Sequence, residues 1–199
     1  MSVTKELYNK LRAFESYSSW AIWAKPEEGK PKSNIEDLSV FSDPALLSIL
    51  NDKYILIGLN ASKHDVSDKV ASQSWGAFHS DDKKRQQDYK LRFALDGTNY
   101  WGSYMTDILK GYPEKDSRKA IRYIKTFNNP QKSDEYIGGF IKELDCYETK
   151  PTLIAIGNAV EKILRKYFPE YKIVKIRHYS SWINKESYRK EVLNQLKGV

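Results

Sequence analysis

Four short runs of apolar and β-branched residues recur along this chain, separated by segments with helical spacing. The run at 54–59 is almost continuous in Ile and Leu, which is typical of a strand buried on both faces of a parallel sheet. The four runs are residues 54–59, 103–109, 152–156 and 172–177. Strands that alternate with helices predict an α/β fold. We therefore expect a three-layer α/β/α sandwich with a central four-stranded parallel sheet.

Apolar residues at three- and four-residue spacing predict the helices. The helices are expected at residues 4–14, 44–50, 82–95, 133–146, 159–167 and 185–197, with a long loop at 60–80. A loop of that length inside a compact domain is usually functional or disordered. A chain of 199 residues fits one domain. We divide it into an N-terminal helical extension, residues 1–52, and a sandwich core, residues 53–199.

The composition excludes several classes of protein. The apolar runs are too short to cross a bilayer, and the charged N-terminal segment lacks the apolar stretch of a signal peptide. Cys146 is the only cysteine, which excludes an internal disulfide and a cysteine-ligated zinc or iron–sulfur site. His64 and His79 lie in the long loop without a ligand pattern for a metal. We expect a cytoplasmic monomer with no membrane partner, metal or other cofactor.

The formal net charge of +7 is concentrated between Lys110 and Lys132, where seven basic residues stand against two acidic ones. The basic residues are Lys110, Lys115, Arg118, Lys119, Arg122, Lys125 and Lys132. Clustered Lys and Arg side chains bind phosphates, and aromatic side chains, which make up 13% of this chain, stack on bases. The pattern suits a polyanion as a partner. A solvated basic surface is the alternative interpretation.

Each predicted strand ends in polar residues that can carry chemistry. Asn60 follows the first run, Asp107 lies near the end of the second, Asn158 follows the third, and His178 follows the fourth. The carboxyl ends of parallel strands meet at one edge of a sheet, and ligands of open α/β sheets bind there. We therefore expect these side chains to gather around a single substrate.

In order, these strand ends resemble the motifs of the uracil-DNA glycosylase superfamily over about residues 53–197. The superfamily has a first strand ending in Gly-x-Asn/Asp-Pro, a segment whose Phe stacks on the extruded base, a strand ending in Thr-Asn that reads the base, and a last His-Pro-Ser loop. The similar segments here are Gly58-Leu59-Asn60-Ala61-Ser62, Trp75-Gly76-Ala77-Phe78-His79-Ser80, Tyr104-Met105-Thr106-Asp107 and His178-Tyr179-Ser180-Ser181-Trp182, with Leu153-Ile154-Ala155-Ile156-Gly157 as the third strand. The resemblance implies a DNA glycosylase. Ala61 and Tyr179 replace the two motif prolines, which places the chain far from the well-known uracil enzymes.

Hydrolysis of a nucleoside C–N bond builds positive charge on the sugar and negative charge on the departing base. We predict that the amide of Asn60 orients the attacking water and that His178 donates a hydrogen bond to the base. The base must leave the stack, so we expect Phe78 or its rival Trp75 to stack on it and Trp182 to fill the gap. Further DNA contacts are expected from Ser62, Asn158, Ser180, Ser181, Arg118, Lys119 and Arg122.

Each assignment has a structural alternative. Asn60 can cap the turn after its strand, His178 can be a structural imidazole, and Phe78 can belong to the core. Trp182 can pack under the C-terminal helix, and Asn158 can cap the helix that follows it or grip a phosphate. A non-catalytic DNA-binding protein with a glycosylase-like fold is therefore an alternative function.

Asp107 discriminates most between substrates. A carboxylate only accepts hydrogen bonds, so it matches the N4 amino group of cytosine and repels O4 of uracil; a structural ion pair is its alternative role. Ordinary cytosine in the cell's own DNA cannot be a safe target. We therefore expect a modified cytosine, such as those of bacteriophage DNA that some members of the superfamily are thought to remove in antiviral defence. Uracil removal in base-excision repair is the alternative. No strand end carries an evident lysine nucleophile, so we expect an abasic site and no lyase step.

Overall fold

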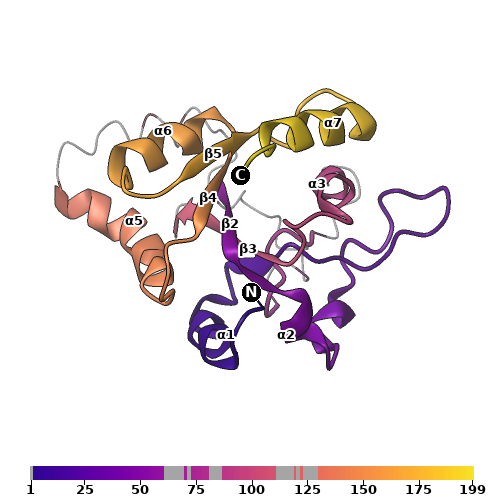
Figure 1. Cartoon of the computed structure of the whole chain (residues 1–199), viewed down its shortest axis with the longest axis horizontal. Helices are drawn as coiled ribbons and strands as arrows, with labels where there is room; N and C mark the ends of the chain where they lie inside the picture. Colours follow the sequence, from indigo (N-terminus) through magenta and orange to yellow (C-terminus); the bar gives the residue numbers. More distant parts are fainter. Residues whose placement is uncertain are drawn as a thin grey trace.

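Figure 1 shows the computed structural model of the chain, which describes residues 2–60, 70, 73–80, 87–110, 119, 122 and 130–199. The strands are β1 (Ser18–Trp20), β2 (Asn51–Asn60), β3 (Ser103–Leu109), β4 (Thr152–Ile156) and β5 (Ile173–Ile176). The α-helices are α1 (Lys5–Leu11), α2 (Leu46–Ile49), α3 (Asp88–Leu95), α5 (Pro130–Leu144), α6 (Asn158–Tyr167) and α7 (Lys185–Gln195), and the short 3₁₀ helices are η1 (Arg12–Phe14) and η2 (Leu38–Ser42).

The five strands form one sheet in the order β1-β3-β2-β4-β5. Strands β2 to β5 are parallel, and β1 is antiparallel to β3. The predicted α/β fold with a parallel central sheet is confirmed, but the prediction of four strands is wrong. The additional strand, β1, lies within residues 1–52, which we expected to be helical. Its three residues form no apolar run, and it is held at the sheet edge by pairing with β3 and by the fully buried Trp20.

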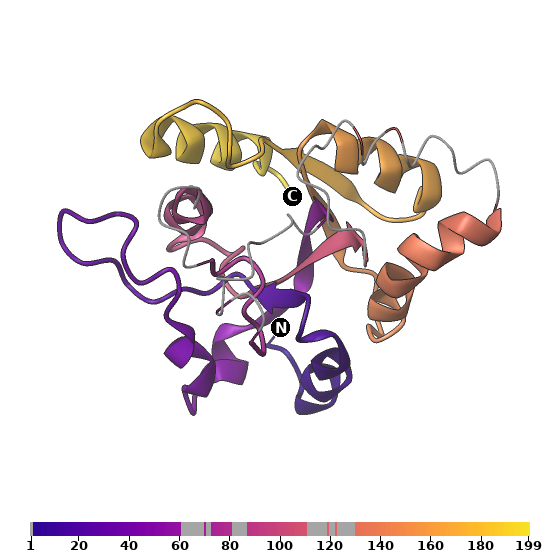
Figure 2. The same cartoon turned by 180° about the vertical axis from the view of Figure 1, so that it is seen from behind.

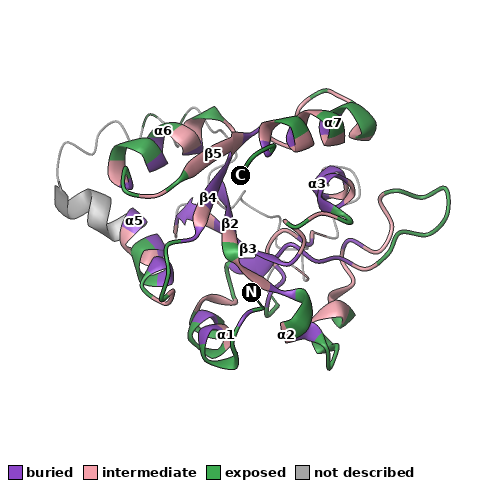
Figure 3. Cartoon of the chain, in the orientation of Figure 1, coloured by how far each residue is buried: buried purple, intermediate pink, exposed green. Residues whose placement is uncertain are grey.

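Alternate residues of the central strands pack on opposite faces of the sheet. Ile55 and Ile57 of β2 belong to one hydrophobic cluster, which includes residues of α1, α5 and α6, whereas Leu56 belongs to a second cluster with α3 and α7. Figures 1 and 2 show α5 and α6 on one side of the sheet and α3 on the other. Buried residues concentrate on the strands (Figure 3). A fully buried Ile or Leu side chain contributes about 1.5–3 kcal/mol, so burial on both faces accounts for the continuous apolar run of β2.

The predicted element bounds agree closely with the structure for strands that are buried on both faces of the sheet. The strands predicted at 103–109 and 152–156 coincide with β3 and β4. The helix expected at 4–14 divides into α1 and η1, and the one expected at 82–95 is observed from Asp88, since residues 81–86 lie outside the described part. Within the described ranges, no helix combines the length and apolar character needed to span a membrane.

Candidate active site

The pair Gly58 and Asp107 lies where β2 and β3 approach the carboxyl edge of the sheet. The two residues are register partners, so their Cα–Cβ directions lie on the same face. A Cβ atom placed on Gly58 would lie 2.1 Å from Oδ1 of Asp107 and 3.5 Å from Cε1 of Phe78. The carboxyl group therefore occupies space that only a glycine at position 58 leaves free. The structure thus brings two of the predicted base-binding residues together.

Trp75, the rival of Phe78 for stacking, lies in the core instead. Its side chain is only 3% exposed, and its indole N–H donates to the hydroxyl of Tyr8 at 3.0 Å. It packs with Trp20 in the cluster that contains α1 and α5. Phe78 is partly buried against the opposite cluster, and its carbonyl oxygen accepts a hydrogen bond from Nε1 of Trp23 at 3.3 Å. The burial of Trp75 gives it a structural role, which leaves Phe78 as the candidate stacking residue.

His178 follows β5, and the Nδ1 edge of its ring is hydrogen-bonded within its own loop. The backbone N–H of Ser180 donates to Nδ1 of His178 at 3.2 Å, and the Ser180 hydroxyl lies 2.9 Å from the same atom. Because Nδ1 accepts, we assign the neutral tautomer with its proton on Nε2. Burial lowers the pKa of His178 below its ordinary 6.5, so the ring is neutral at pH 7. A neutral Nε2–H donor can stabilise negative charge that develops on a leaving group.

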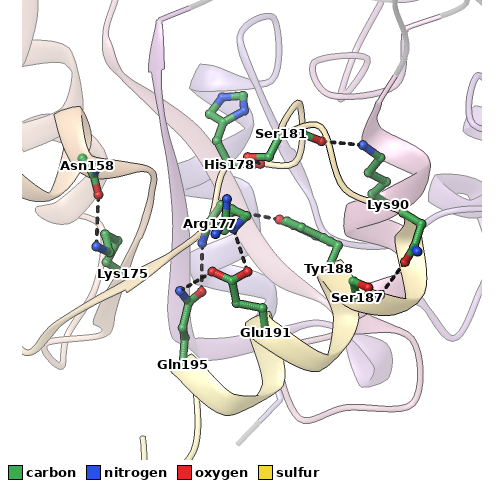
Figure 4. Close-up of polar contacts among 11 residues, drawn as sticks. Lys90, Asn158, Lys175, Arg177, His178, Ser181, Ser187, Tyr188, Glu191 and Gln195 are labelled. Atoms are coloured by element: carbon green, nitrogen blue, oxygen red, sulfur yellow. Dashed lines mark hydrogen bonds and ion pairs between the residues drawn. The ribbon is translucent and has the colours of Figure 1, made fainter.

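The loop that carries His178, residues 177–182, is fixed by both neighbouring helices (Figure 4). We call it the His178 loop. Nζ of Lys90 on α3 donates to the carbonyl oxygen of Ser181 at 2.8 Å, and the Ser181 hydroxyl donates to the carbonyl oxygen of His178 at 2.6 Å. From α7, the hydroxyl of Tyr188 donates to the carbonyl oxygen of Arg177 at 2.9 Å. Lys90 is 5% exposed, and nothing in the charged pattern of its helix predicts that burial.

Asn60 is the last residue of β2, and only β4 separates β2 from β5. The backbones of β2 and β5 are therefore two strand spacings apart, about 10 Å. Gly157, after β4, has a φ of 97°, which favours glycine, and a Cβ atom there would lie 3.6 Å from Cβ of His178. Asn60, Asp107 and His178 thus lie along the carboxyl edge of neighbouring strands, as the strand ends predicted.

The protonation of Asp107 is balanced near neutrality. Burial raises its pKa from the ordinary 3.8 to about 7, while the Lys110 ammonium lowers the pKa and the Glu143 carboxylate raises it to smaller extents. Both forms of the side chain are therefore present at pH 7. The carboxylate only accepts hydrogen bonds, whereas the carboxylic acid also donates one. Asp107 can complement an amino group above pH 7 and a carbonyl group below it.

On the other face of the sheet, Lys110 and Glu143 form a buried ion pair. The Glu143 side chain is 0% exposed, and its carboxylate lies 2.9 Å from Nζ of Lys110. The same carboxylate accepts hydrogen bonds from the hydroxyls of Tyr104 and Thr106, each at 2.9 Å. Our inclusion of Lys110 in the DNA-binding basic segment is therefore wrong, because its ammonium is directed into the interior.

The remaining predicted DNA contacts lie at the surface or outside the described residues. Trp182 is fully exposed, so the alternative that it packs under the C-terminal helix is wrong. Asn158 is exposed at the first residue of α6; its Oδ1 accepts from Nζ of Lys175 at 3.0 Å, and no side chain caps the helix. Lys119 and Arg122 are exposed, while Ser62 and Arg118 lie outside the described residues.

His79 is a core residue. It is fully buried, its Nδ1 lies 3.1 Å from the carbonyl oxygen of Ile35, and burial lowers its pKa to about 4. Its ring packs against Trp23 and Phe41. In the part of the chain that the structure describes, no three His, Cys, Asp or Glu side chains are grouped so that they could hold a metal ion.

Comparisons with protein-family models, curated proteins and solved structures give no match to this chain. The arrangement combines an amide at Asn60, a flat ring at Phe78, a titrating carboxyl at Asp107 and a neutral N–H donor at His178.

Proposed function

We propose that this protein is a monofunctional DNA glycosylase of the uracil-DNA glycosylase superfamily, with that superfamily's three-layer fold. It would hydrolyse the N-glycosidic bond of a flipped base and leave an abasic site. The observation that supports this most directly is the placement of Asn60, Asp107 and His178 on one edge of the sheet, with Phe78 beside Asp107. These are the residue types that the reaction requires, and they come from separate parts of the sequence.

The proposed mechanism follows from these groups. The flipped base stacks on Phe78 and directs its amino or carbonyl edge toward Asp107. As the C–N bond breaks, its electron pair moves to the base, and Nε2–H of His178 stabilises the negative charge on the base oxygen. The amide oxygen of Asn60 orients a water for attack on the sugar carbon, and the proton released neutralises the departing base. In this mechanism Asn60 and His178 each contribute a few kcal/mol of transition-state stabilisation.

Hydrolysis without a lyase step is supported by the environment of Lys110. This lysine directly follows β3, three residues after Asp107 in the sequence. Its Nζ is held by the buried Glu143 carboxylate on the opposite face of the sheet. An amine committed to an ion pair does not form a Schiff base with the sugar. Borohydride treatment during turnover should therefore trap no covalent complex.

The substrate that the site fits best is a cytosine-type base, and a modified cytosine of bacteriophage DNA, removed as antiviral defence, is the proposed target. Ionised Asp107 accepts from the N4 amino group. The pKa of about 7 also supports a second candidate, uracil, because protonated Asp107 can donate to O4. Uracil release should then rise as pH falls below 7, whereas release of cytosine-type bases should rise as pH increases above 7.

The test uses matched duplexes that contain uracil, cytosine or glucosylated hydroxymethylcytosine at one position, followed by alkaline cleavage at abasic sites. Asn60→Ala and His178→Ala should each reduce base release by about a hundredfold or more while DNA binding persists. Asn194→Ala, which alters an exposed asparagine of α7, is the matched control and should retain full activity.

The outcomes separate the possible functions. Release of the modified cytosine alone supports the substrate proposed here. Efficient release of uracil with the modified cytosine untouched refutes that substrate and supports a repair enzyme. Tight DNA binding with no base release from any duplex refutes the glycosylase and supports a non-catalytic DNA-binding protein.

A further inference from the structure

Two aromatic side chains of α3, those of Tyr89 and Phe93, are only partly buried. The two residues are four positions apart, so they lie on the same side of the helix. Tyr89 packs against the hydrophobic cluster that contains α3 and α7, whereas Phe93 belongs to neither cluster. The hydrophobic core therefore gives no reason for an aromatic residue at position 93.

Cationic side chains from the two segments that flank α3 lie over these rings. From α7, Nζ of Lys185 lies 4.0 Å from the centre of the Phe93 ring, and the guanidinium of Arg189 lies 5.6 Å from it. From residues 24–34, Nζ of Lys32 lies 5.3 Å from the centre of the Tyr89 ring. This surface combines aromatic rings with positive charge. We call it the α3 face and define it as Lys32, Tyr89, Phe93, Lys185 and Arg189.

Hydrogen bonds fix both flanking segments to α3. The buried guanidinium of Arg92 donates at 2.7–2.9 Å to three carbonyl oxygens of the segment 24–34, those of Ala24, Pro31 and Ser33. On the other side, the guanidinium of Arg189 donates to two carbonyl oxygens of α3, those of Phe93 and Ala94. Figure 1 shows α7 and the segment 24–34 on either side of α3. The backbone that carries the rings and cations is therefore preorganised.

The α3 face adjoins the His178 loop. Nζ of Lys90, on the same helix, donates to the carbonyl oxygen of Ser181 at 2.8 Å, and the next residue, Trp182, is fully exposed. One acidic side chain, Glu186, pairs with Lys185, so the three cations of the face keep a positive excess. Cations bind phosphates, and aromatic side chains stack on the bases of single strands. The bases of a duplex already stack on one another, so exposed rings suit an unpaired strand.

We propose that the α3 face binds a single-stranded stretch of DNA next to the target base. The rings of Phe93 and Tyr89 stack on its bases, and the three cations bind its phosphates. The choice of DNA as the ligand rests on the proposed function. An exposed lysine holds an aromatic ring weakly, and its flexible stem lets the ammonium group move. The strand therefore draws Lys185 onto a phosphate and uncovers the Phe93 ring for stacking.

The first experiment tests stacking. Fluorescence anisotropy measures the Kd of the unaltered protein and its variants for a labelled oligonucleotide of natural bases, as a single strand and as the matching duplex. Phe93→Ala should raise the Kd for the single strand about 5-fold or more and the Kd for the duplex less than twofold. Phe93→Tyr keeps a ring and should bind like the unaltered protein. Tyr167→Ala is the matched control, because Tyr167 lies under Nζ of Lys166 at 4.8 Å on α6, across the sheet.

The second experiment tests the phosphate contacts through salt dependence. Lys32→Gln and Lys185→Gln should each reduce the salt slope of single-strand binding by about 0.7. Lys166→Gln removes the cation over the control ring on α6 and should leave the slope unchanged. These lysines are at least partly exposed, so the variants keep the fold if Phe93→Ala does not.

The outcomes separate this inference from the glycosylase proposal, because binding is measured without turnover. The predicted losses in a protein that releases no base would support the α3 face and refute the glycosylase. Base release by a protein whose Phe93→Ala and lysine variants all bind single strands normally would overturn the α3 face alone. Equal weakening of single-strand and duplex binding in Phe93→Ala would overturn the stacking role. Tighter binding of an RNA strand of the same sequence would overturn DNA as the ligand.

Discussion

Replacing Asp107 with asparagine should stabilise the protein at pH 8 although it removes a group from the proposed site. Asparagine keeps the shape of the side chain, so the contact with Gly58 is preserved. The variant avoids the free-energy cost that the folded protein otherwise bears for keeping a carboxylate in a buried position. Burial raises the pKa of Asp107 from 3.8 to about 7, and a difference of about 3 in pKa corresponds to about 4 kcal/mol. Because the side chain is partly buried, this is an upper figure.

The sign of the pH dependence follows from proton linkage. Between pH 4 and pH 7 the folded protein keeps a proton on Asp107 that the unfolded chain has lost, so stability falls as pH rises through this window. The slope from this one group approaches about 1.4 kcal/mol per pH unit. The Asp107→Asn variant lacks this pH-dependent contribution to stability. The difference in stability, variant minus unaltered protein, should therefore be about 1 kcal/mol at pH 4.5, grow toward pH 7 and level off above it.

Urea unfolding of both proteins at pH 4.5, 6, 7 and 8 measures this difference. At pH 8 the variant should be more stable by up to about 4 kcal/mol, which for a chain of this size corresponds to roughly 8–16 °C in Tm. Asp145→Asn, at an exposed aspartate after α5, is the control and should show no such pH-dependent gain. Parallel stability curves for Asp107→Asn and the unaltered protein would refute the argument that Asp107 is buried at a cost.

Three further changes test other parts of the structure. Lys110→Met leaves the Glu143 carboxylate on α5 buried without a charge partner. The free energy of unfolding, measured in urea, should therefore fall by about 3–5 kcal/mol, and a fall of less than 1 kcal/mol would contradict the buried pair. Trp182→Ala should change the free energy of unfolding by no more than about 0.5 kcal/mol, because the side chain is exposed. It should reduce base release from duplex DNA more than from single strands, and equal losses on both would exclude Trp182 as the residue that fills the gap. Replacing Arg118, Lys119 and Arg122 with alanine should weaken DNA binding and reduce its salt slope by about 0.9 per lost phosphate contact, and an unaltered slope would exclude this surface.

The parts of the fold that could be predicted are those in which local sequence and burial agree. Strands β3 and β4 lie between two helical layers and are almost wholly buried, so their bounds follow from the run alone. Strand β1 could not be predicted, because its pairing with β3 at the sheet edge depends on residues far away in the sequence. The same distinction holds in the site. The strand-end rule located Asn60, Asp107 and His178 at one edge, since it depends only on chain direction.

The roles of residues that depend on tertiary packing could not be predicted from the sequence. Phe78 and Trp75 are three positions apart in one segment, and only the structure shows that Trp75 enters the core cluster while Phe78 lies beside Gly58. Asp88 and Lys90 are charged residues at the start of a helix, where solvent exposure is the ordinary expectation. Their burial, and the contact of Lys90 with the His178 loop, arise because α3 packs against the sheet next to α7.

Gly58 offers the sharpest test of the site, because a single added carbon is enough to disturb it. A Cβ atom at position 58 would lie 2.1 Å from Oδ1 of Asp107, far inside contact distance, so the carboxyl group must move by 1 Å or more. Misplacement on that scale costs about a hundredfold in rate. Gly58→Ala should therefore reduce base release by about that factor while the protein remains folded.

Gly138→Ala on α5 is the matched control, because a Cβ atom there meets nothing within 4 Å and alanine favours a helix by up to about 1 kcal/mol. This variant should be as active as the unaltered protein. Gly58→Ala combined with Asp107→Gly relieves the contact by removing the carboxyl group. If Asp107 reads the base, the combined variant should be no more active than Gly58→Ala alone. Full activity in Gly58→Ala would show that the Asp107 carboxyl does not need its present position, and with it the case for Asp107 as the base-reading residue would fall.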